Sequence, residues 1–275
     1  MSRPSVWAVA QRTSRAQRSG RYLPDSMPHP AKMLPSLAAR AVETFTQPGD
    51  LVLDPMCGIG TTLVEATHLG RDAIGVEYEA RWAALATANA EHARARGATG
   101  RAEVLVGDCR HLRSVVPADA AGQVAMILTS PPYGASTHGR VRARGGRVRK
   151  WDHRYSADRA NLAHQGLDGI LAAMEAMLRE AAFVLAPAGV VVLTARPWRC
   201  GGVLIDLPGH LVATAERAGF ELVERNVALL AALRGGDVVP RASFFQLNEV
   251  RKARRQGTPL RVIAHEDVLV FGRAS

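Results

Sequence analysis

Leu51-Val52-Leu53-Asp54 is a short apolar run that leads through Pro55-Met56-Cys57-Gly58-Ile59-Gly60 into Thr61-Thr62. The apolar run predicts a buried strand, the two glycines predict a sharp turn, and threonine commonly caps the start of a helix. A helix start of this kind exposes backbone N–H groups to which a polar ligand can bind. A plain turn would need the same glycines, so this motif alone does not decide the function.

The alternation of strand and helix continues along the chain in both directions. We expect strands at 51–54, 73–77, 104–106, 124–129, 190–194, 221–227 and 268–271. We expect helices at 31–46, 61–69, 81–96, 167–185 and 210–218. Strands that alternate with helices of this length form right-handed crossovers and a parallel sheet covered on both faces. The sequence therefore predicts one α/β domain, a doubly wound Rossmann-like sheet of seven strands.

Two carboxylates follow the next two predicted strands. Glu77 comes about 20 residues after the glycine turn, where it can accept hydrogen bonds from both hydroxyls of a ribose. Asp108 ends the following strand and is suited to an adenine amino group. Together with the turn they predict a nucleoside pocket. The lysine of a phosphate-binding P-loop is absent after Gly60, which argues against a nucleoside triphosphatase.

The fourth predicted strand runs into Ser130-Pro131-Pro132-Tyr133. Two prolines fix the backbone and remove two N–H donors, so the carbonyls around them lack internal partners. A hydroxyl, a free carbonyl and an aromatic ring then project from one rigid tip. This arrangement suits a planar amine, because two acceptors can take its hydrogens while the ring stacks on its base.

The chain has 275 residues and a formal net charge of +10, and its basic residues are unevenly distributed. Residues 1–24, 134–165 and 251–261 together carry +16, and the rest of the chain carries −6. Clustered cations indicate a polyanionic partner, because binding to a phosphate backbone releases counterions. A compositional preference for arginine would not explain why acidic residues avoid these segments.

The predicted organisation is a basic, extended N-terminal arm (1–28) followed by one domain (29–275) with basic inserts at 134–165 and about 230–265. The three cysteines are widely spaced, which indicates neither a disulfide framework nor a metal cluster, and we expect no metal. No signal peptide or membrane span is apparent, so we expect a cytoplasmic protein without membrane partners. The oligomeric state cannot be predicted from the sequence.

These motifs resemble those of a known family, the exocyclic-amino methyltransferases of nucleic acids, above all the N4-cytosine and N6-adenine DNA methyltransferases. The resemblance implies S-adenosylmethionine as cofactor. It places His29 and Lys32 in a segment that closes over the methionine end of the cofactor, and it extends to a closing strand at 265–271. The cofactor-binding residues it implies are His29, Lys32, Asp54, Pro55, Met56, Cys57, Gly58, Gly60, Thr61, Thr62, Glu77, Tyr78, Asp108 and Cys109.

The resemblance makes Ser130, Pro131, Pro132 and Tyr133 the catalytic tip. Ser130 Oγ and the Pro131 carbonyl would accept the two amino hydrogens, and Tyr133 would stack on the target base. This chain has Met56 where the family usually has phenylalanine. Serine at the tip resembles the cytosine-N4 members more than the others, although some adenine enzymes share it.

The basic inserts supply the expected nucleic-acid contacts. Most such contacts hold phosphate, and some arginines read guanine in the major groove. Trp151 and Tyr155 are either stacking residues or anchors of the insert, and residues 251–255 are either a second binding face or a solvated helix. The candidate nucleic-acid-binding residues are Arg140, Arg142, Arg144, Arg147, Arg149, Lys150, Arg251, Lys252, Arg254 and Arg255.

The leading hypothesis is S-adenosylmethionine-dependent methylation of an exocyclic amino group in DNA, at cytosine N4. The family also implies a link to restriction-modification, although one chain cannot show a partner nuclease. The first alternative is an RNA guanine-N2 or adenine-N6 methyltransferase, which would use the same pocket and a similar tip. The second alternative, from another class, is a catalytically silent nucleic-acid-binding protein.

Overall fold

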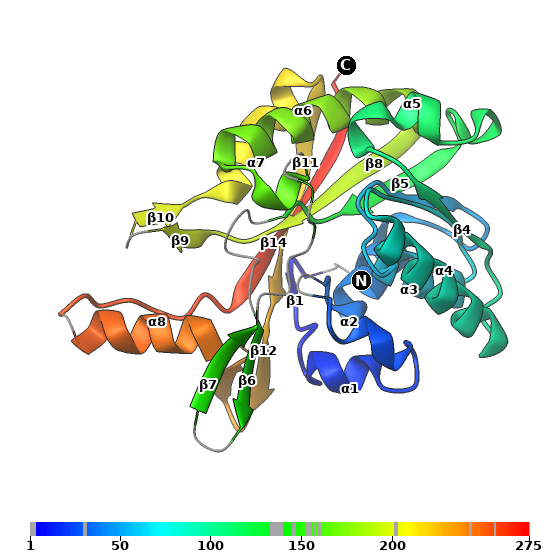
Figure 1. Cartoon of the computed structure of the whole chain (residues 1–275). Helices are drawn as coiled ribbons and strands as arrows, with labels where there is room; N and C mark the ends of the chain where they lie inside the picture. Colours follow the sequence, from blue (N-terminus) through cyan, green and yellow to red (C-terminus); the bar gives the residue numbers. More distant parts are fainter. Residues whose placement is uncertain are drawn as a thin grey trace.

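The centre of the molecule is a twisted eight-stranded sheet (Figure 1). The computed structural model describes residues 4–29, 32–132, 140–144, 147–151, 156, 158, 161–200, 203–241, 244–255 and 257–274. The strands of the sheet, in spatial order, are β1 (Val6–Trp7), β11 (Phe220–Leu229), β14 (His265–Arg273), β8 (Leu185–Ala195), β5 (Val124–Thr129), β2 (Leu51–Asp54), β3 (Asp72–Glu77) and β4 (Ala102–Val106). Neighbours run parallel except at β14, which is antiparallel to β11 and β8. The predicted doubly wound α/β fold is confirmed.

Helices cover both faces of the sheet (Figure 1). One face carries α5 (Leu112–Val115), α6 (Leu167–Val184) and α7 (Leu207–Arg217), whose apolar residues form one buried core with the strands. The other face carries α2 (Pro35–Phe45), α3 (Thr61–His68) and α4 (Ala80–Ala95) over a second core. Helix α2 was predicted from residue 31, but it begins at Pro35. Proline suits the first helical position because it lacks an N–H, and an N–H there would have no partner within the helix.

The N-terminal segment differs most from the prediction. Residues 4–29 are not an extended arm, because they contain β1, the helix α1 (Ser14–Arg18) and a 3₁₀ turn at Pro24–Ser26. Val6 and Trp7 pair with Val227 and Ala228, which makes β1 an eighth strand where seven were predicted. Trp7 and Tyr22 are buried. Burial of these apolar residues folds the segment onto the domain, and a two-residue strand carries no periodicity that a sequence could reveal.

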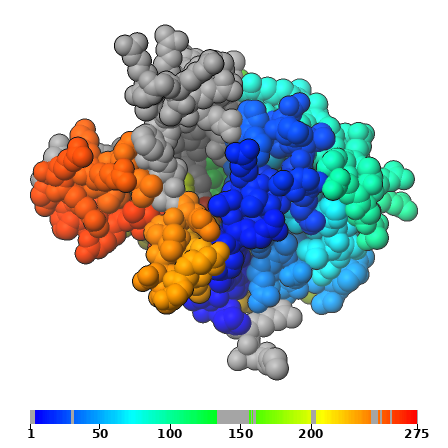
Figure 2. Space-filling model, turned by 90° about the horizontal axis from the view of Figure 1, so that it is seen from below, coloured from blue at the N-terminus to red at the C-terminus, as the bar shows by residue number. Residues whose placement is uncertain are grey.

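Three hairpins and one helix extend from the sheet, and the sequence predicted none of the hairpins. The hairpins are β6 (Arg140–Arg144) with β7 (Arg147–Trp151), β9 (Trp198–Cys200) with β10 (Val203–Ile205), and β12 (Ala231–Arg234) with β13 (Asp237–Pro240). The helix is α8 (Phe244–Arg255). Hairpin β12–β13 lies beside the N-terminal segment (Figure 2), where Arg234 Nη2 donates to the Gln11 carbonyl at 2.9 Å.

The sheet topology gathers the candidate residues at one edge. β5, β2, β3 and β4 are parallel, so their carboxyl ends lie at the same edge of the sheet. The residues that follow these strands are therefore neighbours, although the sequence separates Asp54 from Ser130 by more than 70 residues. Ligand sites of open α/β sheets lie at this edge.

Candidate functional site

The glycine loop between β2 and α3 depends on left-handed backbone. Gly58 has a φ of 56° and Gly60 a φ of 78°. The Gly60 N–H donates to the Cys57 carbonyl at 2.8 Å, and Gly60 caps α3. A Cβ on Gly58 would lie 3.1 Å from His29 Nε2. Both positions therefore require glycine, and the loop packs directly against His29.

Glu77, the last residue of β3, holds this loop. Its Oε2 accepts a hydrogen bond from the Gly58 N–H at 2.8 Å, and its Oε1 accepts one from the Glu79 N–H at 3.0 Å. The side chain is buried beside the loop. The sequence predicts a carboxylate at the carboxyl end of this strand, and the structure places Glu77 there. We call the edge formed by the carboxyl ends of β2, β3, β4 and β5 the rim. Contact with a ribose remains a prediction.

Asp54, the last residue of β2, fixes the entry to the loop. Its Oδ2 accepts from Thr62 Oγ1 at 2.6 Å, and its Oδ1 accepts from the Met56 N–H at 3.1 Å. Burial raises the pKa of Asp54 to about 6, and these hydrogen bonds offset only part of the rise. The carboxyl group thus titrates close to neutral pH and connects the strand to the first turn of α3.

Asp108 follows β4 and is engaged by a neighbour that the sequence analysis missed. Arg110 Nε donates to Asp108 Oδ1 at 2.9 Å, and the Arg110 backbone N–H donates to the same oxygen at 2.9 Å. Burial alone would raise the pKa of Asp108, but the bonds from Arg110 outweigh it and lower the pKa below its ordinary value. Asp108 is therefore an anion at the carboxyl end of β4, which suits an acceptor for an amino group.

The end of the 134–165 insert lies against this rim. Tyr78, which follows Glu77, donates from its hydroxyl to Asp158 Oδ2 at 2.7 Å, and this bond raises the pKa of Tyr78. Asn161 Nδ2 donates to Glu79 Oε1 at 3.2 Å. The insert thus returns to the sheet next to the expected adenosine site.

Cys57 and Cys109 are free and buried. Burial raises the pKa of both thiols, that of Cys109 to about 12. Neither side chain is an ionised nucleophile near neutral pH, because the thiolate is the reactive form. Both residues therefore act as apolar walls of the loop and rim.

The candidate catalytic tip follows β5 directly. Pro131 is buried, while Ser130 and Pro132 are half-buried. Since β5 lies between β2 and β8, the tip emerges next to the glycine loop. Tyr133 lies outside the described residues, so its stacking role remains a prediction.

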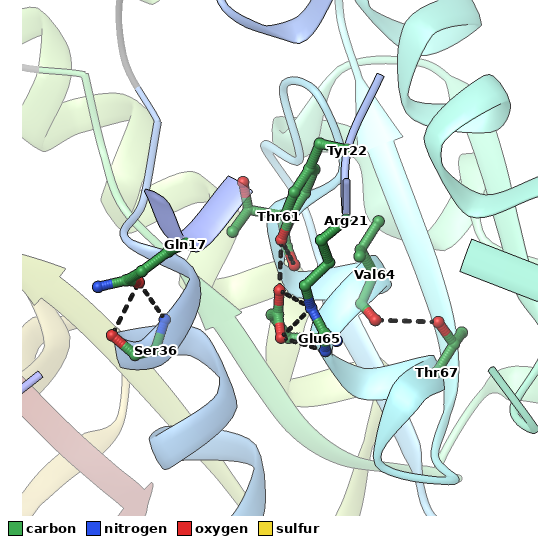
Figure 3. A network of polar contacts seen from close by, with 8 residues as sticks. All are labelled: Gln17, Arg21, Tyr22, Ser36, Thr61, Val64, Glu65 and Thr67. Carbon is green, nitrogen blue, oxygen red and sulfur yellow. Dashed lines mark hydrogen bonds and ion pairs between the residues drawn. The ribbon is translucent and has the colours of Figure 1, made fainter. Parts of the chain in front are cut away.

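Residues 18–29, which we call the strap, are anchored to α3 by one buried carboxylate (Figure 3). Arg21 Nε donates to Glu65 Oε1 at 2.9 Å and its Nη2 donates to Oε2 at 2.6 Å. The Tyr22 hydroxyl donates to the same Oε1 at 2.6 Å. Burial and the nearby Glu65 raise the pKa of Tyr22, so the phenol stays neutral and acts as a donor.

Asn89 in α4 connects the strap to the glycine loop. Its Oδ1 accepts from the Leu23 N–H at 2.9 Å, and its Nδ2 donates to Ser26 Oγ at 2.8 Å and to the Ile59 carbonyl at 2.9 Å. The sequence analysis missed both Asn89 and Glu65. The one acidic residue of α3 (Thr61–His68) and the one asparagine of the alanine-rich helix α4 were the available signals.

The strap leads into the segment predicted to close over the cofactor. His29 is buried, and its ring meets Trp82 edge-on with centroids 4.6 Å apart. Lys32 Nζ donates to the Met27 carbonyl at 3.1 Å and to the His29 carbonyl. His29 thus packs against the glycine loop, whereas the structure shows Lys32 shaping the segment itself. Cofactor contact by either residue remains a prediction.

The basic residues of α8 are exposed, unlike the buried polar residues around the glycine loop. Arg251, Lys252, Arg254 and Arg255 are exposed on α8. Arg254 Nε donates to the Leu260 carbonyl at 3.2 Å. Candidate residues of the first insert lie on hairpin β6–β7, but their side chains are outside the part of the chain that the structure describes. They are Arg140, Arg142, Arg144, Arg147, Arg149 and Lys150.

Comparison with known proteins agrees with this geometry. Residues 3–88 match the family model described as DNA methylase. The resemblance inferred from the motifs is therefore confirmed over the strap, the glycine loop and Glu77. The fold is also similar to that of a solved structure, TrmN from Thermus thermophilus, with a TM-score of 0.53 and 21% identity over 94% of this chain and 53% of that one.

Two curated relatives match shorter parts of the chain. A tRNA (guanine(10)-N2)-dimethyltransferase from Methanocaldococcus jannaschii is 34% identical over 110 residues, 40% of this chain and 31% of the relative. A 23S rRNA (uracil(1939)-C(5))-methyltransferase from Acidithiobacillus ferrooxidans is 36% identical over 89 residues, 32% of this chain and 20% of the relative. The matches thus span a third or less of the relatives' own length.

The site fits the cofactor that this methylase resemblance implies. S-adenosylmethionine is the expected cofactor, and the loop, Glu77 and Asp108 supply the donors and acceptors that an adenosine group needs. At the start of α3, the Thr61 hydroxyl is buried and has no hydrogen-bond partner within the described structure. A polar ligand at the helix start would supply one.

The described residues lack two further features. No group of three or more His, Cys, Asp or Glu side chains is placed to hold a metal ion there. In the same residues, no helix is both long and apolar enough to span a membrane.

Proposed function

We propose that this protein is an S-adenosylmethionine-dependent methyltransferase that acts on an exocyclic amino group of a nucleic-acid base. The observation that carries the proposal is a convergence at one sheet edge. The Ser130-Pro131 tip, the glycine loop and the Glu77 and Asp108 carboxylates all follow neighbouring parallel strands. A methyl donor bound over the loop would therefore lie beside the acceptors that grip the amine.

The role we assign to Ser130 and Pro131 follows from the chemistry of the amine. An exocyclic amine donates its lone pair into the base ring and is a poor nucleophile while it is planar. Ser130 Oγ and the Pro131 carbonyl would each accept one amino hydrogen, which turns the lone pair out of the ring. Bound S-adenosylmethionine supplies an electrophilic methyl group on a sulfonium ion. A nitrogen–carbon bond would form as the sulfur–carbon bond broke, and the amine would then lose its proton to water.

No strong general base is needed for this reaction. The amine becomes much more acidic as it is methylated, so its proton leaves readily. Positioning and fixed dipoles would supply most of the acceleration. Cys57 and Cys109 have raised pKa values and follow other strands, which disfavours a covalent cysteine mechanism among the described residues.

The substrate has two candidates, each with its own support. Cytosine N4 in DNA is favoured by the serine at position 130 and by the DNA methylase match over residues 3–88. Guanine N2 in RNA is favoured by the identity to the tRNA (guanine(10)-N2)-dimethyltransferase. A base in duplex DNA must first be flipped out at a cost of a few kcal/mol, and a single-stranded base avoids most of that cost.

One labelling experiment tests the function and separates the substrates. The full chain is incubated with methyl-labelled S-adenosylmethionine and either genomic DNA or total RNA, and the digested nucleosides are identified. We expect label on N4-methylcytosine from DNA. Label on N2-methylguanosine from RNA would replace the DNA assignment and keep the reaction class. No label with either substrate would favour the binding-only alternative.

A further inference from the structure

Arg18, at the end of α1, is a buried cation without a full set of partners. The residue is 2% exposed. Its Nη2 donates to the Met33 carbonyl, but within the described structure its Nε and Nη1 have no hydrogen-bond partner. Arginine keeps its charge at any ordinary pH, and leaving its donors unsatisfied in the interior is costly. The methyltransferase site described above gives Arg18 no role.

The charges around Arg18 do not balance. Its guanidinium lies over the Tyr22 ring, 4.9 Å from the centroid, and is attracted to Glu65. Arg21 already binds both oxygens of Glu65. Two guanidinium groups thus share one carboxylate, and Tyr22 is neutral. This cluster carries one unbalanced positive charge, and an anionic ligand would neutralise it.

The cluster borders the start of α3, where a second orphan group lies. The Tyr22 hydroxyl is 3.5 Å from the Thr61 carbonyl, and the ring packs in a small core with Ile59 of the glycine loop. Thr61 has a buried hydroxyl without a partner in the described chain, and no side chain caps the helix. A helix start carries partial positive charge and attracts anions.

We propose that Arg18 binds the carboxylate at the amino-acid end of the cofactor. The inference rests on the proposed function, because S-adenosylmethionine carries no phosphate and its α-carboxylate is its one anionic group. Arg18 donates to this carboxylate through Nε or Nη1, and Thr61 donates its hydroxyl. The adenosine end then lies toward Glu77 and Asp108, on the strands that follow in the sheet.

The test compares two ligands that differ in the amino-acid part. S-adenosylhomocysteine carries the carboxylate, and 5′-methylthioadenosine lacks the whole amino-acid end. In the variant Arg18→Gln, we expect calorimetry to show about 10- to 100-fold weaker binding of S-adenosylhomocysteine, because a charge-assisted hydrogen bond is lost. Binding of 5′-methylthioadenosine should be unchanged.

Arg21→Gln is the matched control, because it removes the same charge from the same cluster but leaves the Arg18 donors intact. This variant should weaken the binding of S-adenosylhomocysteine and of 5′-methylthioadenosine by the same factor. Equal weakening of both ligands in Arg18→Gln, or no weakening, would overturn the proposal. If Arg18→Gln does not fold, the wild-type protein provides a second test, since it should prefer S-adenosylhomocysteine to its carboxamide at least tenfold. Failure of the wild-type chain to bind any of these ligands would instead refute the proposed function.

Discussion

The glycine-loop side of the molecule and its basic side are built in opposite ways. Around the loop, Glu65, Asn89 and Glu77 are buried, and each makes several hydrogen bonds to neighbouring elements. On α8, by contrast, Arg251 and Lys252 are exposed. The first region is held together by hydrogen bonds within the protein, which suits one small molecule of fixed shape. The second offers exposed positive charge, which suits a long polyanion.

The largest expected effect is at the candidate catalytic tip, beside the glycine loop. We expect Ser130→Ala to lower the turnover number about 10²- to 10³-fold, because one acceptor for the amine is lost in the transition state. Cofactor affinity should stay within about twofold of wild type. Single-turnover label transfer and calorimetry with S-adenosylhomocysteine measure the two quantities. Full activity in the variant would show that the tip is misassigned.

The second prediction concerns the proton on Asp54. Because its pKa is about 6 in the folded protein and 3.8 ordinarily, the folded protein binds this proton more tightly than the unfolded chain does. The resulting stabilisation of the folded protein is complete below about pH 4 and is lost as the pH rises through 6. Compared with Asp54→Asn, the wild-type free energy of unfolding should fall by at most about 3 kcal/mol over this range.

Urea unfolding without cofactor, at several pH values, measures this difference. Asp108→Asn is the control of opposite sign, because Arg110 lowers the pKa of Asp108 and its contribution is lost as the pH falls. A pH-independent gap between wild type and Asp54→Asn would disprove the assigned shift.

The third prediction separates strap positioning from general stability. Asn89→Ala leaves the Leu23 N–H and the Ile59 carbonyl unpaired and should cost about 2 kcal/mol of unfolding free energy. It should also raise the KM for S-adenosylmethionine severalfold, since the glycine loop loses its link to the strap. The turnover number should change little.

Asn226 provides the matched control, because it is also buried and its Nδ2 donates to Glu224 Oε1 at 2.8 Å. It lies on β11, at the opposite end of the sheet from β3 and β4. Asn226→Ala should destabilise the protein without changing the KM. If both variants raised the KM alike, the strap would have no special part in cofactor binding.

The smallest expected effect lies on the basic side. Arg251→Gln with Lys252→Gln should weaken nucleic-acid binding about tenfold and make its salt dependence shallower by about two in log–log slope. Cofactor affinity should not change. The control pair Arg94→Gln with Arg101→Gln removes the same charge from exposed positions in α4 and just before β4. It should change neither nucleic-acid binding nor cofactor affinity. Equal weakening by the two pairs would mean that net charge, rather than α8, binds the nucleic acid.

The strands that carry the site could be predicted because their sequences are short apolar runs bounded by glycine or polar residues. β2 and β5 have the predicted ends, and Gly58, Glu77 and Ser130 lie at the same sheet edge for that reason. Parallel strands leave little freedom in where their carboxyl ends meet.

The polar contacts that hold the site were beyond the sequence. Glu65 meets Arg21 across 44 positions, and Asn89 meets Ser26 across 63. A single sequence holds no record of such pairings, because neither residue breaks the helical pattern around it. Short elements such as β1 were missed because their pairing depends on the partner strand β11.

β1 also constrains the order in which the molecule can be completed. Val6 and Trp7 pair with Val227 and Ala228, so β1 can form only after the chain between these two segments has been made. Closing so long a loop is slow, and proteins dominated by distant pairings fold slowly. Until then Trp7 has no strand partner at this edge of the sheet. Until β1 pairs, the edge of β11 that it covers stays open, so this edge of the sheet depends on two segments that lie far apart in the chain.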